Sequence, residues 1–369
     1  MTTSGPDQGT PVVLGLDFGG TKIAAAVCDL SGRRLGTTTV ASGRDLGAHE
    51  SFRRGVAAGR ELLDSEVPGS SLVAVGACTF GIPFDDRVEL APTIPGWSSL
   101  AFGRLLREAF PGVRVSVATD VKAAATAEAR WGSLVGCDPG LYVNLGTGLA
   151  AALVVGGQVV GGRHGAAGEI AYNLRRPTDV GRALAERIPL EDRVSGLALS
   201  RQATRAAGRP MRAADVFDTH AADPVTDTVL QEFVAELCFH VVNLAIALDP
   251  ERVAVGGGMV RSWDVLGAAL EHALAAAVPY PPQLVVAAFP HDAALLGALA
   301  LGVEAATGFR TSADLQDPRE QAGGELDSGE HVSEELSRVS AVRDGRGPNG
   351  RSSDRVSPQV GSTGEGQSR

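Results

Sequence analysis

Short apolar runs that end in polar or glycine-rich turns recur along the chain. Residues 12–17 are apolar up to a terminal carboxylate and lead through two glycines into residues 23–28, a second apolar run. Two buried strands joined by a glycine turn are typical of a β-hairpin. Residues 140–144 and 150–155 repeat this order of strand, glycine turn and strand. The repeat predicts a duplicated chain with two similar halves, each opening on a hairpin whose turn can contact phosphate.

Helical and extended periods alternate in the remaining apolar segments, as they do in α/β folds. The sequence of 369 residues is long enough for two such lobes. The spacing of apolar positions predicts helices over residues 50–63, 100–110, 123–131, 233–248 and 293–306, and further strands over residues 72–78, 113–118 and 252–255.

The composition changes after about Gly308. Small, charged and amide side chains dominate there and no apolar period persists, so the segment cannot bury enough surface to offset its chain entropy. We therefore predict an N-terminal α/β lobe over residues 11–119, closed by a C-terminal helix at 293–307, a C-terminal lobe over residues 120–292, and a disordered tail over residues 308–369. The tail is interpreted as an inert extension in preference to a regulatory or partner-binding segment.

Composition and charge narrow the classes of partner. The chain is 44% hydrophobic with a formal net charge of −10, and its basic residues form no long run. Nucleic acid and anionic membranes both need a cationic surface, so we expect neither as a partner. No long apolar run is present to span a bilayer, and residues 1–8 lack the features of a secretory signal. Cysteines without a CxxC pair predict neither a disulfide scaffold nor a cysteine zinc site, which favours a reducing cytoplasm.

Residues 15–22, Gly-Leu-Asp-Phe-Gly-Gly-Thr-Lys, carry the strongest local signal. Glycines permit a tight turn in which backbone N–H groups converge on phosphate oxygens, a threonine adds a hydroxyl donor, and an aspartate can bind Mg²⁺ directly or through water. A structural hairpin with a glycine turn is the competing interpretation. The segment is neither a Walker A loop, which needs GxxxxGK[ST], nor a protein-kinase DFG motif, because no HRD precedes it. The candidate cofactor ligands here are Asp17, which is also the candidate Mg²⁺ ligand, Gly19, Gly20, Thr21 and Lys22.

Two further glycine turns follow apolar strands. Each is a weak signal alone, because a plain tight turn accounts for it. Three such turns in one duplicated α/β chain together favour a nucleotide cleft. The additional candidates for nucleotide binding are Gly146, Thr147 and Gly148 in one turn and Gly256, Gly257 and Gly258 in the other.

The order of these motifs resembles the ROK family of bacterial sugar kinases and related repressors. The resemblance extends over about residues 11–307. That family has an actin-like ATPase fold, which is a duplicated ribonuclease-H-like α/β fold whose two lobes enclose ATP and sugar in an interlobe cleft, and the resemblance implies the same here. It rests on DxGGTK at residues 17–22, GxP at 81–83, PGW at 95–97, Asp120, GTG at 146–148, GAAGE at 165–169, SGxAL at 195–199 and GGGM at 256–259.

The resemblance implies roles at individual positions. Residues 17–22 and the GTG turn match the family's phosphate motifs, and the GGG turn matches its adenosine-binding turn. Asp120 matches the catalytic base, which accepts the proton of a hydroxyl nucleophile, although an isolated carboxylate would otherwise be interpreted as a surface charge. Glu169 and Glu191 match carboxylates that bind sugar hydroxyls. The full candidate substrate set is Thr119, Asp120, Glu169, Tyr172 and Glu191.

Several positions depart from the family's pattern. Thr119 and Lys122 stand where the family has asparagine, and Tyr172 stands where it has a histidine that binds zinc together with a cysteine cluster. Residues 173–190 contain no cysteine. Zinc needs thiolate or imidazole ligands at close spacing, so we predict no zinc site. Two interpretations of Lys122 stay open: it lowers the pKa of Asp120 or binds charge, or it is a surface lysine.

These observations predict a cytoplasmic kinase that uses ATP and Mg²⁺ to phosphorylate a hydroxyl of a hexose or hexose-like polyol. A primary hydroxyl is the preferred candidate. Because the departures fall on the substrate side, an acceptor without an ordinary anomeric centre, such as a C7-cyclitol, is one candidate, and glucose is another.

The alternatives are a non-catalytic sugar-binding sensor or regulator and a pseudokinase scaffold. Only about ten residues precede the first predicted strand, too few for the DNA-binding helices of the family's repressors, and the retained Asp17 and Asp120 oppose a pseudokinase. The oligomeric state stays open, and a homodimer is compatible with the sequence.

Overall fold

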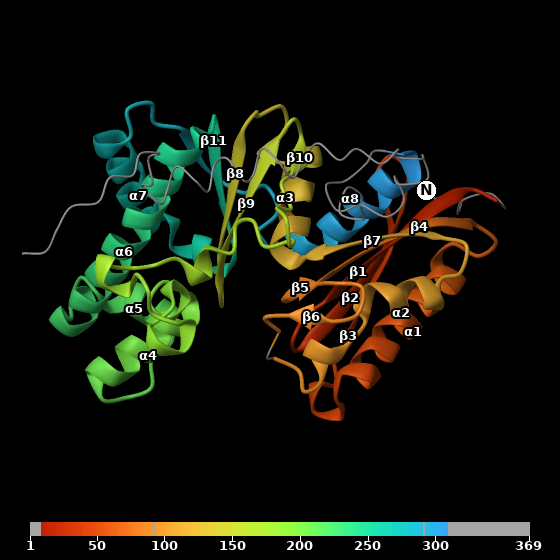
Figure 1. Ribbon diagram of the computed structural model, residues 1–369, viewed down its shortest axis with the longest axis horizontal. Coiled ribbons are helices and arrows are strands. Elements are labelled where there is room, and N and C mark those ends of the chain that lie inside the picture. Colours follow the sequence, from red (N-terminus) through yellow and green to blue (C-terminus); the bar gives the residue numbers. More distant parts are fainter. Residues whose placement is uncertain (1–8, 92, 291, 309–369) are drawn as a thin grey trace, which may run out of the picture. The chain divides into compact units, whose positions relative to one another are not determined.

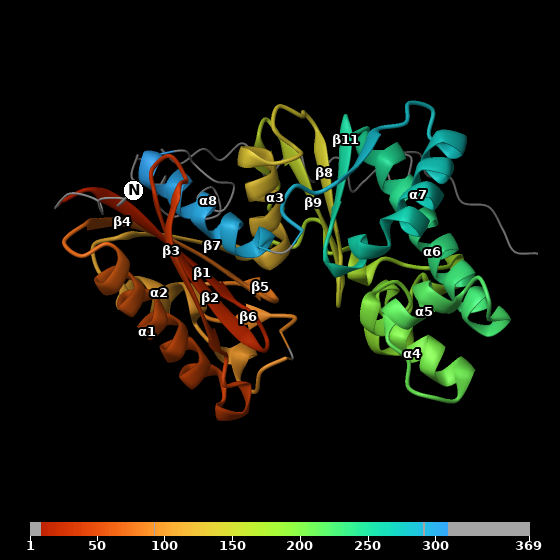
Figure 2. The same ribbon diagram turned by 180° about the vertical axis from the view of Figure 1, so that it is seen from behind.

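The computed structural model in Figure 1 describes residues 9–91, 93–290 and 292–308. The tail predicted for residues 308–369 lies outside this range from residue 309 onward. Two five-stranded sheets organise the described part of the chain, and helices cover both faces of each sheet. Figure 2 shows the same elements from behind, with α8 on the first sheet and α3 beside it.

The first sheet has the strand order β3-β2-β1-β4-β7. Strands β1, β2 and β3 form an antiparallel meander, and β4 and β7 run parallel to β1. Phe18 packs against Phe52 and Phe102 with ring centroids 5.8 and 5.1 Å apart, which joins the sheet to the helices α1 and α2 on one face. The elements are β1 (Pro11–Phe18), β2 (Lys22–Asp29), β3 (Arg34–Ala41), α1 (Ala48–Glu66), β4 (Ser71–Thr79), α2 (Phe102–Ala109), β7 (Arg114–Thr119) and, on the other face, α8 (Ala293–Thr307); a small ladder pairs β5 (Ile82–Pro83) with β6 (Val88–Glu89).

The second sheet repeats this arrangement in the order β10-β9-β8-β11-β12. The hairpin β8–β9 corresponds to β1–β2, and β11 and β12 are parallel to their neighbours as β4 and β7 are. The elements are α3 (Asp120–Trp131), β8 (Gly140–Leu145), β9 (Leu149–Val155), β10 (Gln158–Val159), α4 (Gly196–Ala207), α5 (Ala213–Thr219), α6 (Pro224–Leu248), β11 (Arg252–Gly256), α7 (Trp263–Ala277) and β12 (Gln283–Val286). Helices α4 to α7 share one hydrophobic cluster with the sheet, and α3 covers the opposite face. The predicted α/β class and the predicted duplication are confirmed.

The structure adds strands and helices that the apolar pattern does not predict, namely β3, β5, β6, β10, β12, α4, α5 and α7. Strands β3 and β12 are edge strands without a fully buried position. β3 is interrupted by polar residues and β12 has only four residues, so neither provides the longer apolar run that predicts a buried strand. The helix predicted at 233–248 begins earlier, at Pro224, because Asp223 caps α6. The Asp223 carboxylate accepts a hydrogen bond from the backbone N–H of Val225 at 2.9 Å.

Among the described helices, α6 is long and apolar enough to cross a membrane by length and composition. It also contributes Phe233, Leu237 and Val241 to the hydrophobic core of the second sheet. Core helices meet the same criterion, so this helix is weak evidence for a membrane span.

Helix α8 packs so closely on both the first sheet and α3 that their backbones are in direct contact. A Cβ atom on Gly297 would lie 1.9 Å from the carbonyl oxygen of Ala123 in α3, and a Cβ atom on Gly76 of β4 would lie 1.8 Å from that of Ala298. Only glycine leaves room at these two positions. Because α3 follows β7 directly and packs on the second sheet, this contact fixes the helix that begins with Asp120 against the first sheet.

Glu128 of α3 anchors the chain that leads from β12 into α8. Its side chain is completely buried, and its carboxylate accepts hydrogen bonds from the backbone N–H groups of Ser133 at 2.7 Å, Ala288 at 3.1 Å and Phe289 at 2.9 Å. These donors satisfy a carboxylate that would otherwise be costly to bury. The contact is a second tie between α3 and the start of α8.

Gly297→Ala should lower the free energy of unfolding by about 1–3 kcal/mol or more, because the added methyl group overpacks the contact between α3 and α8. Gly103→Ala is the matched control, since Gly103 also lies in a helix but the nearest atoms to its Cβ would be 3.5 Å away. Alanine there should be neutral or stabilise the protein by up to about 1 kcal/mol. Urea denaturation compares the two variants, and equal stabilities would contradict the close approach.

Candidate active site

Asp120 lies where the last strand of the first sheet becomes α3. Thr119 is the N-cap residue, and its hydroxyl accepts a hydrogen bond from the backbone N–H of Lys122 at 3.2 Å. The Asp120 carboxylate accepts a hydrogen bond from the N–H of Val121 at 2.8 Å, and the dipole at the start of the helix favours its ionised form. The Thr119 hydroxyl therefore caps a helix, in addition to the substrate contact that we predict for it.

Parallel pairing brings Asp17 to the same edge of the first sheet. Asp17 lies opposite Cys78 in the ladder between β1 and β4, and Cys78 lies opposite Ala118 in the ladder between β4 and β7. The carboxyl ends of the three strands are therefore neighbours, at the kind of edge where α/β sheets bind ligands. The Cys78 thiol donates a hydrogen bond to Asp17 Oδ1 at 3.5 Å. The two predicted aspartates are thus brought together.

The electrostatics of this edge are unusual. Burial raises the pKa of Asp120 to about 7, and the negative charge of Asp17 is the next largest cause. Burial also raises the pKa of Asp17 to about 6, although the hydrogen bond from Cys78 opposes this shift. Two ionised carboxylates in such a site repel each other. The pair therefore fits a divalent cation such as Mg²⁺, which typically uses one or two protein carboxylates together with phosphate oxygens.

The first glycine turn is tightly closed beside Asp17. Gly19 donates its N–H to the carbonyl oxygen of Lys22 at 3.0 Å, and the carbonyl oxygen of Gly20 accepts a hydrogen bond from the Ser42 hydroxyl at 3.0 Å. A Cβ atom on Gly20 would lie 2.6 Å from Thr93 Cγ2, so a larger residue would not fit without movement. Thr21 and Lys22 are exposed in this turn, where they are accessible to a ligand.

The second and third glycine turns contact each other through their backbones. Gly257 has φ +90°, and its Cβ would lie 2.5 Å from the backbone of Leu145 and 2.9 Å from the N atom of Gly146. Gly258 has open space where a Cβ atom would lie. The carbonyl oxygen of Gly146 accepts a hydrogen bond at 2.8 Å from the N–H of Gly196, at the start of α4. The absence of side chains leaves a backbone-lined surface that suits phosphate and nucleotide groups.

Glu191 lies against the second turn. Its Oε2 atom accepts a hydrogen bond from the N–H of Leu149 at 2.9 Å, and a Cβ atom on Gly148 would lie 2.4 Å from that oxygen. Burial raises the pKa of Glu191, and the hydrogen bond from Leu149 opposes this shift. The candidate substrate carboxylate and the candidate phosphate turn are therefore direct neighbours.

Glu169 and Tyr172 lie near Glu191. Burial raises the pKa of the Tyr172 hydroxyl, followed by the charges of Glu169 and Glu191. Glu169 also interacts with Lys122, whose Nζ lies 3.5 Å from its Oε1 atom. The Lys122 side chain is only 8% exposed, so its interpretation as a surface lysine is wrong. Burial lowers the pKa of Lys122, and the charge of Glu169 partly offsets this effect.

Sequence reasoning does not find the partners that hold these groups. Gly196 belongs to the SGxAL motif, but its contact with the GTG turn bridges about fifty residues of sequence. In the sequence, Cys78 is indistinguishable from an apolar strand residue, and only the pairing of β1 with β4 shows that it lies beside Asp17. Within the described residues, no group of three or more His, Cys, Asp or Glu side chains could hold a metal ion. The absence of zinc from the protein stays a prediction.

A duplicated α/β core, glycine turns at its hairpins and paired carboxylates at a strand edge define the class of actin-like ATPase folds. A model of the ROK family matches residues 13–305, and the chain belongs to that family. The resemblance inferred from the motif order is thereby confirmed.

Relatives of known structure or assigned activity support the same class. The chain is 30% identical to the kanosamine kinase of Amycolatopsis mediterranei over 258 residues, which cover 68% of this chain and 82% of that protein. It is similar to the crystal structure of the ROK hexokinase from Thermus thermophilus, with 31% identity, a TM-score of 0.68 and coverage of 79% and 97% of the two chains. It is also similar to the ROK glucokinase of Streptomyces griseus in complex with glucose and AMPPNP, with 27% identity, a TM-score of 0.63 and coverage of 79% and 99%.

Asp120→Asn should stabilise the ligand-free protein at pH 8 by about 1–4 kcal/mol. A raised pKa means that the folded protein holds this proton more tightly than the unfolded chain does, so ionisation costs stability as the pH rises from about 4 to 7. The variant lacks that cost, and its advantage should shrink toward pH 4. Urea denaturation across this pH range measures the difference, with Asp264→Asn on the exposed surface of α7 as the control. A difference that does not change with pH would contradict the raised pKa of Asp120.

Proposed function

We propose that the protein is a cytoplasmic ATP-dependent kinase that phosphorylates a hydroxyl group of a hexose or hexose-like polyol. The observation that carries the proposal is the half-buried Asp120 at the start of α3, beside Asp17 at one strand edge, in a chain of the ROK family. The likeness to a glucokinase bound to glucose and AMPPNP supports the choice of nucleotide and acceptor.

The nucleotide side is assigned to the three glycine turns. Their backbone N–H groups are suited to phosphate oxygens, and the third turn to the adenosine end. Bound Mg²⁺ and ATP would supply the transferable phosphoryl group and the positive charge that neutralises it in the transition state. Asp17 would hold the ion, directly or through water. That interaction would favour the ionised forms of Asp17 and Asp120, since a nearby cation opposes the effects that raise their pKa values.

Asp120 acts as the general base in this proposal. Its carboxylate accepts the proton of the acceptor hydroxyl as the oxygen attacks phosphorus. Burial raises the pKa of Asp120 to about 7 in the ligand-free protein, and a bound cation would favour the ionised carboxylate, which is the form that accepts a proton. The hydrogen bond from Val121 fixes the orientation of the carboxylate, so the acceptor meets a base that is already in place.

The acceptor site is assigned to Glu169, Glu191, Tyr172 and the Thr119 hydroxyl. Carboxylates bind vicinal hydroxyls as acceptors, and Glu191 lies beside the second glycine turn, which brings the acceptor close to the phosphates. Because Asp120, Glu169 and Glu191 make the site acidic, we infer a neutral or amino-bearing acceptor. A relative named kanosamine kinase supports a hexose-like acceptor. A C7-cyclitol with a primary hydroxyl is a further candidate, because Tyr172 replaces the family's histidine.

A non-catalytic sugar-binding regulator is the second candidate function. Retention of both Asp17 and Asp120 favours the kinase, because a sensor needs no proton acceptor at the reacting hydroxyl.

Asp120→Asn should lower kcat by about 10²–10⁴ while the fold and ATP binding are kept, because the amide cannot accept a proton. Steady-state ADP formation with the preferred acceptor measures kcat, and calorimetric titration with an ATP analogue measures binding. Asp264→Asn, an exposed change of the same type, should retain full activity. Near-normal turnover by Asp120→Asn would remove this residue from the mechanism.

A screen of ATP consumption against hexoses, amino hexoses, N-acetylhexosamines and C7-cyclitols should identify at least one acceptor. Glucose and glucose 1-phosphate form a matched pair that share the primary hydroxyl and differ in charge. The phosphorylated member should be a poorer acceptor by at least about tenfold, because the carboxylates repel it. If none of these polyols supports ATP consumption, the regulator is favoured. A preference for anionic acceptors would contradict the acidic site.

A further inference from the structure

The segment between Tyr172 and Glu191 joins two candidate acceptor ligands, and most of it has no hydrophobic anchor. Residues 173–189 contain only the single turns η4 (Pro177–Asp179) and η5 (Leu184–Glu186). The larger apolar side chains of this stretch face solvent, namely Leu174, Val180, Leu184 and Ile188, whereas Leu190, next to Glu191, is fully buried in the core of the second sheet. Apart from Leu190, the segment is therefore held by polar contacts.

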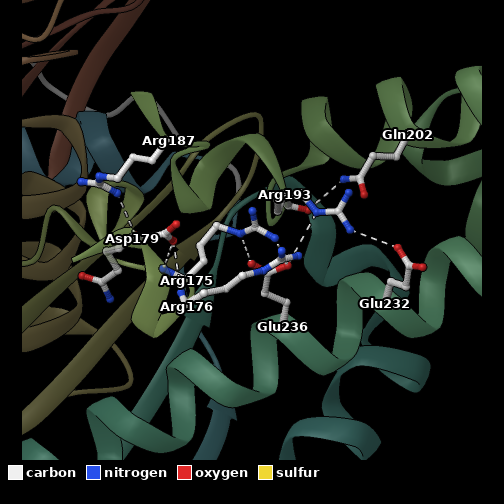
Figure 3. A network of polar contacts seen from close by, with 9 residues as sticks. Arg175, Arg176, Asp179, Arg187, Arg193, Gln202, Glu232 and Glu236 are labelled. Atoms are coloured by element: carbon white, nitrogen blue, oxygen red, sulfur yellow. Dashed lines mark hydrogen bonds and ion pairs between the residues drawn. The ribbon is translucent and has the colours of Figure 1, made fainter. Parts of the chain in front are cut away.

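Ion pairs to α6 hold both ends of this segment, as Figure 3 shows. Arg175, three residues after Tyr172, has a side chain that is only 7% exposed and donates from Nε and Nη2 to the two carboxylate oxygens of Glu236. Such two-point contacts fix direction as well as distance. Arg193, two residues after Glu191, places its Nε 3.6 Å from Glu236 Oε2 and donates from Nη2 to Glu232 at 3.0 Å. One half-buried carboxylate, that of Glu236, therefore connects the two ends.

Contacts within the segment carry this anchorage to Tyr172. The Asp179 carboxylate accepts hydrogen bonds from the backbone N–H groups of Arg175 and Arg176, both at 3.1 Å. Arg187 donates from Nη2 to the carbonyl oxygen of Tyr172 at 2.8 Å. The backbone on the C-terminal side of Tyr172 is thereby clamped from within the segment.

We propose that Arg175, Arg193 and Glu236 are positioning residues that set Tyr172 and Glu191 for acceptor binding. This inference rests on the proposed kinase function for its kinetic consequence, but not for its structural one. None of the three residues is assigned a contact with nucleotide or acceptor. They act through the segment, so their loss should affect binding of the acceptor and leave binding of the nucleotide intact.

Glu236→Gln tests the inference, because it keeps the shape of the side chain and removes the charge that the two arginines share. The KM for the acceptor should rise about tenfold to a hundredfold, with the KM for ATP changed less than about twofold. Arg175→Lys keeps the charge but loses the two-point geometry, and should raise the acceptor KM by a smaller factor, about threefold to tenfold. Asp215→Asn, which removes the exposed pair with Arg212 in the same lobe, should change neither constant.

Hydrogen exchange of the full-length protein without ligands gives a readout that does not depend on catalysis. Peptides from residues 173–190 should exchange faster in Glu236→Gln than in the wild type or in Asp215→Asn. If the segment loosens and no acceptor is ever phosphorylated, the proposed function fails and the positioning role of the network stands. Unchanged exchange, or equal rises in the KM values for ATP and acceptor, would overturn the inference.

Discussion

The close approach of two helix backbones at Gly297 fixes the position of Asp120, the residue on which the proposed chemistry depends. Helix α3 begins at the end of a strand of the first sheet and packs its side chains on the second sheet. Helix α8 reaches it at backbone distance while also packing on the first sheet. The Glu128 carboxylate adds a buried tie between α3 and the chain before α8. These contacts therefore fix the position of Asp120, which is the first residue of α3.

The same position explains the electrostatics. Parallel strands bring Asp17 and Asp120 to one half-buried edge. Burial raises the pKa of both carboxyl groups, and the charge of Asp17 adds to the shift of Asp120. Two neighbouring carboxylates are unfavourable in the ligand-free protein, and the proposed function would relieve this cost when a cation and a hydroxyl bind. In that proposal, the site gives up some stability of the fold in exchange for activity, which is common in active sites.

The local features of the fold were predictable and the long-range contacts were not. The two hairpins, the three glycine turns and the strand that ends at Asp120 follow from short apolar runs and turn residues. Polar edge strands such as β3 gave no comparable signal. The contacts of Glu191 with Leu149 and of Glu236 with Arg175 and Arg193 join residues about forty to sixty positions apart, and the sequence pattern of any one segment does not indicate its partner. Lys122 illustrates the same limit, since only the structure shows that it is buried against Glu169.

The most direct measurement is a crystal structure of the protein with Mg²⁺, a non-hydrolysable ATP analogue and a phosphorylatable polyol. The account predicts a carboxylate oxygen of Asp120 about 3 Å from the acceptor hydroxyl, with the ion beside Asp17 and the phosphates on the glycine turns. An acceptor hydroxyl held away from Asp120, with a different group in place to take its proton, would contradict the account.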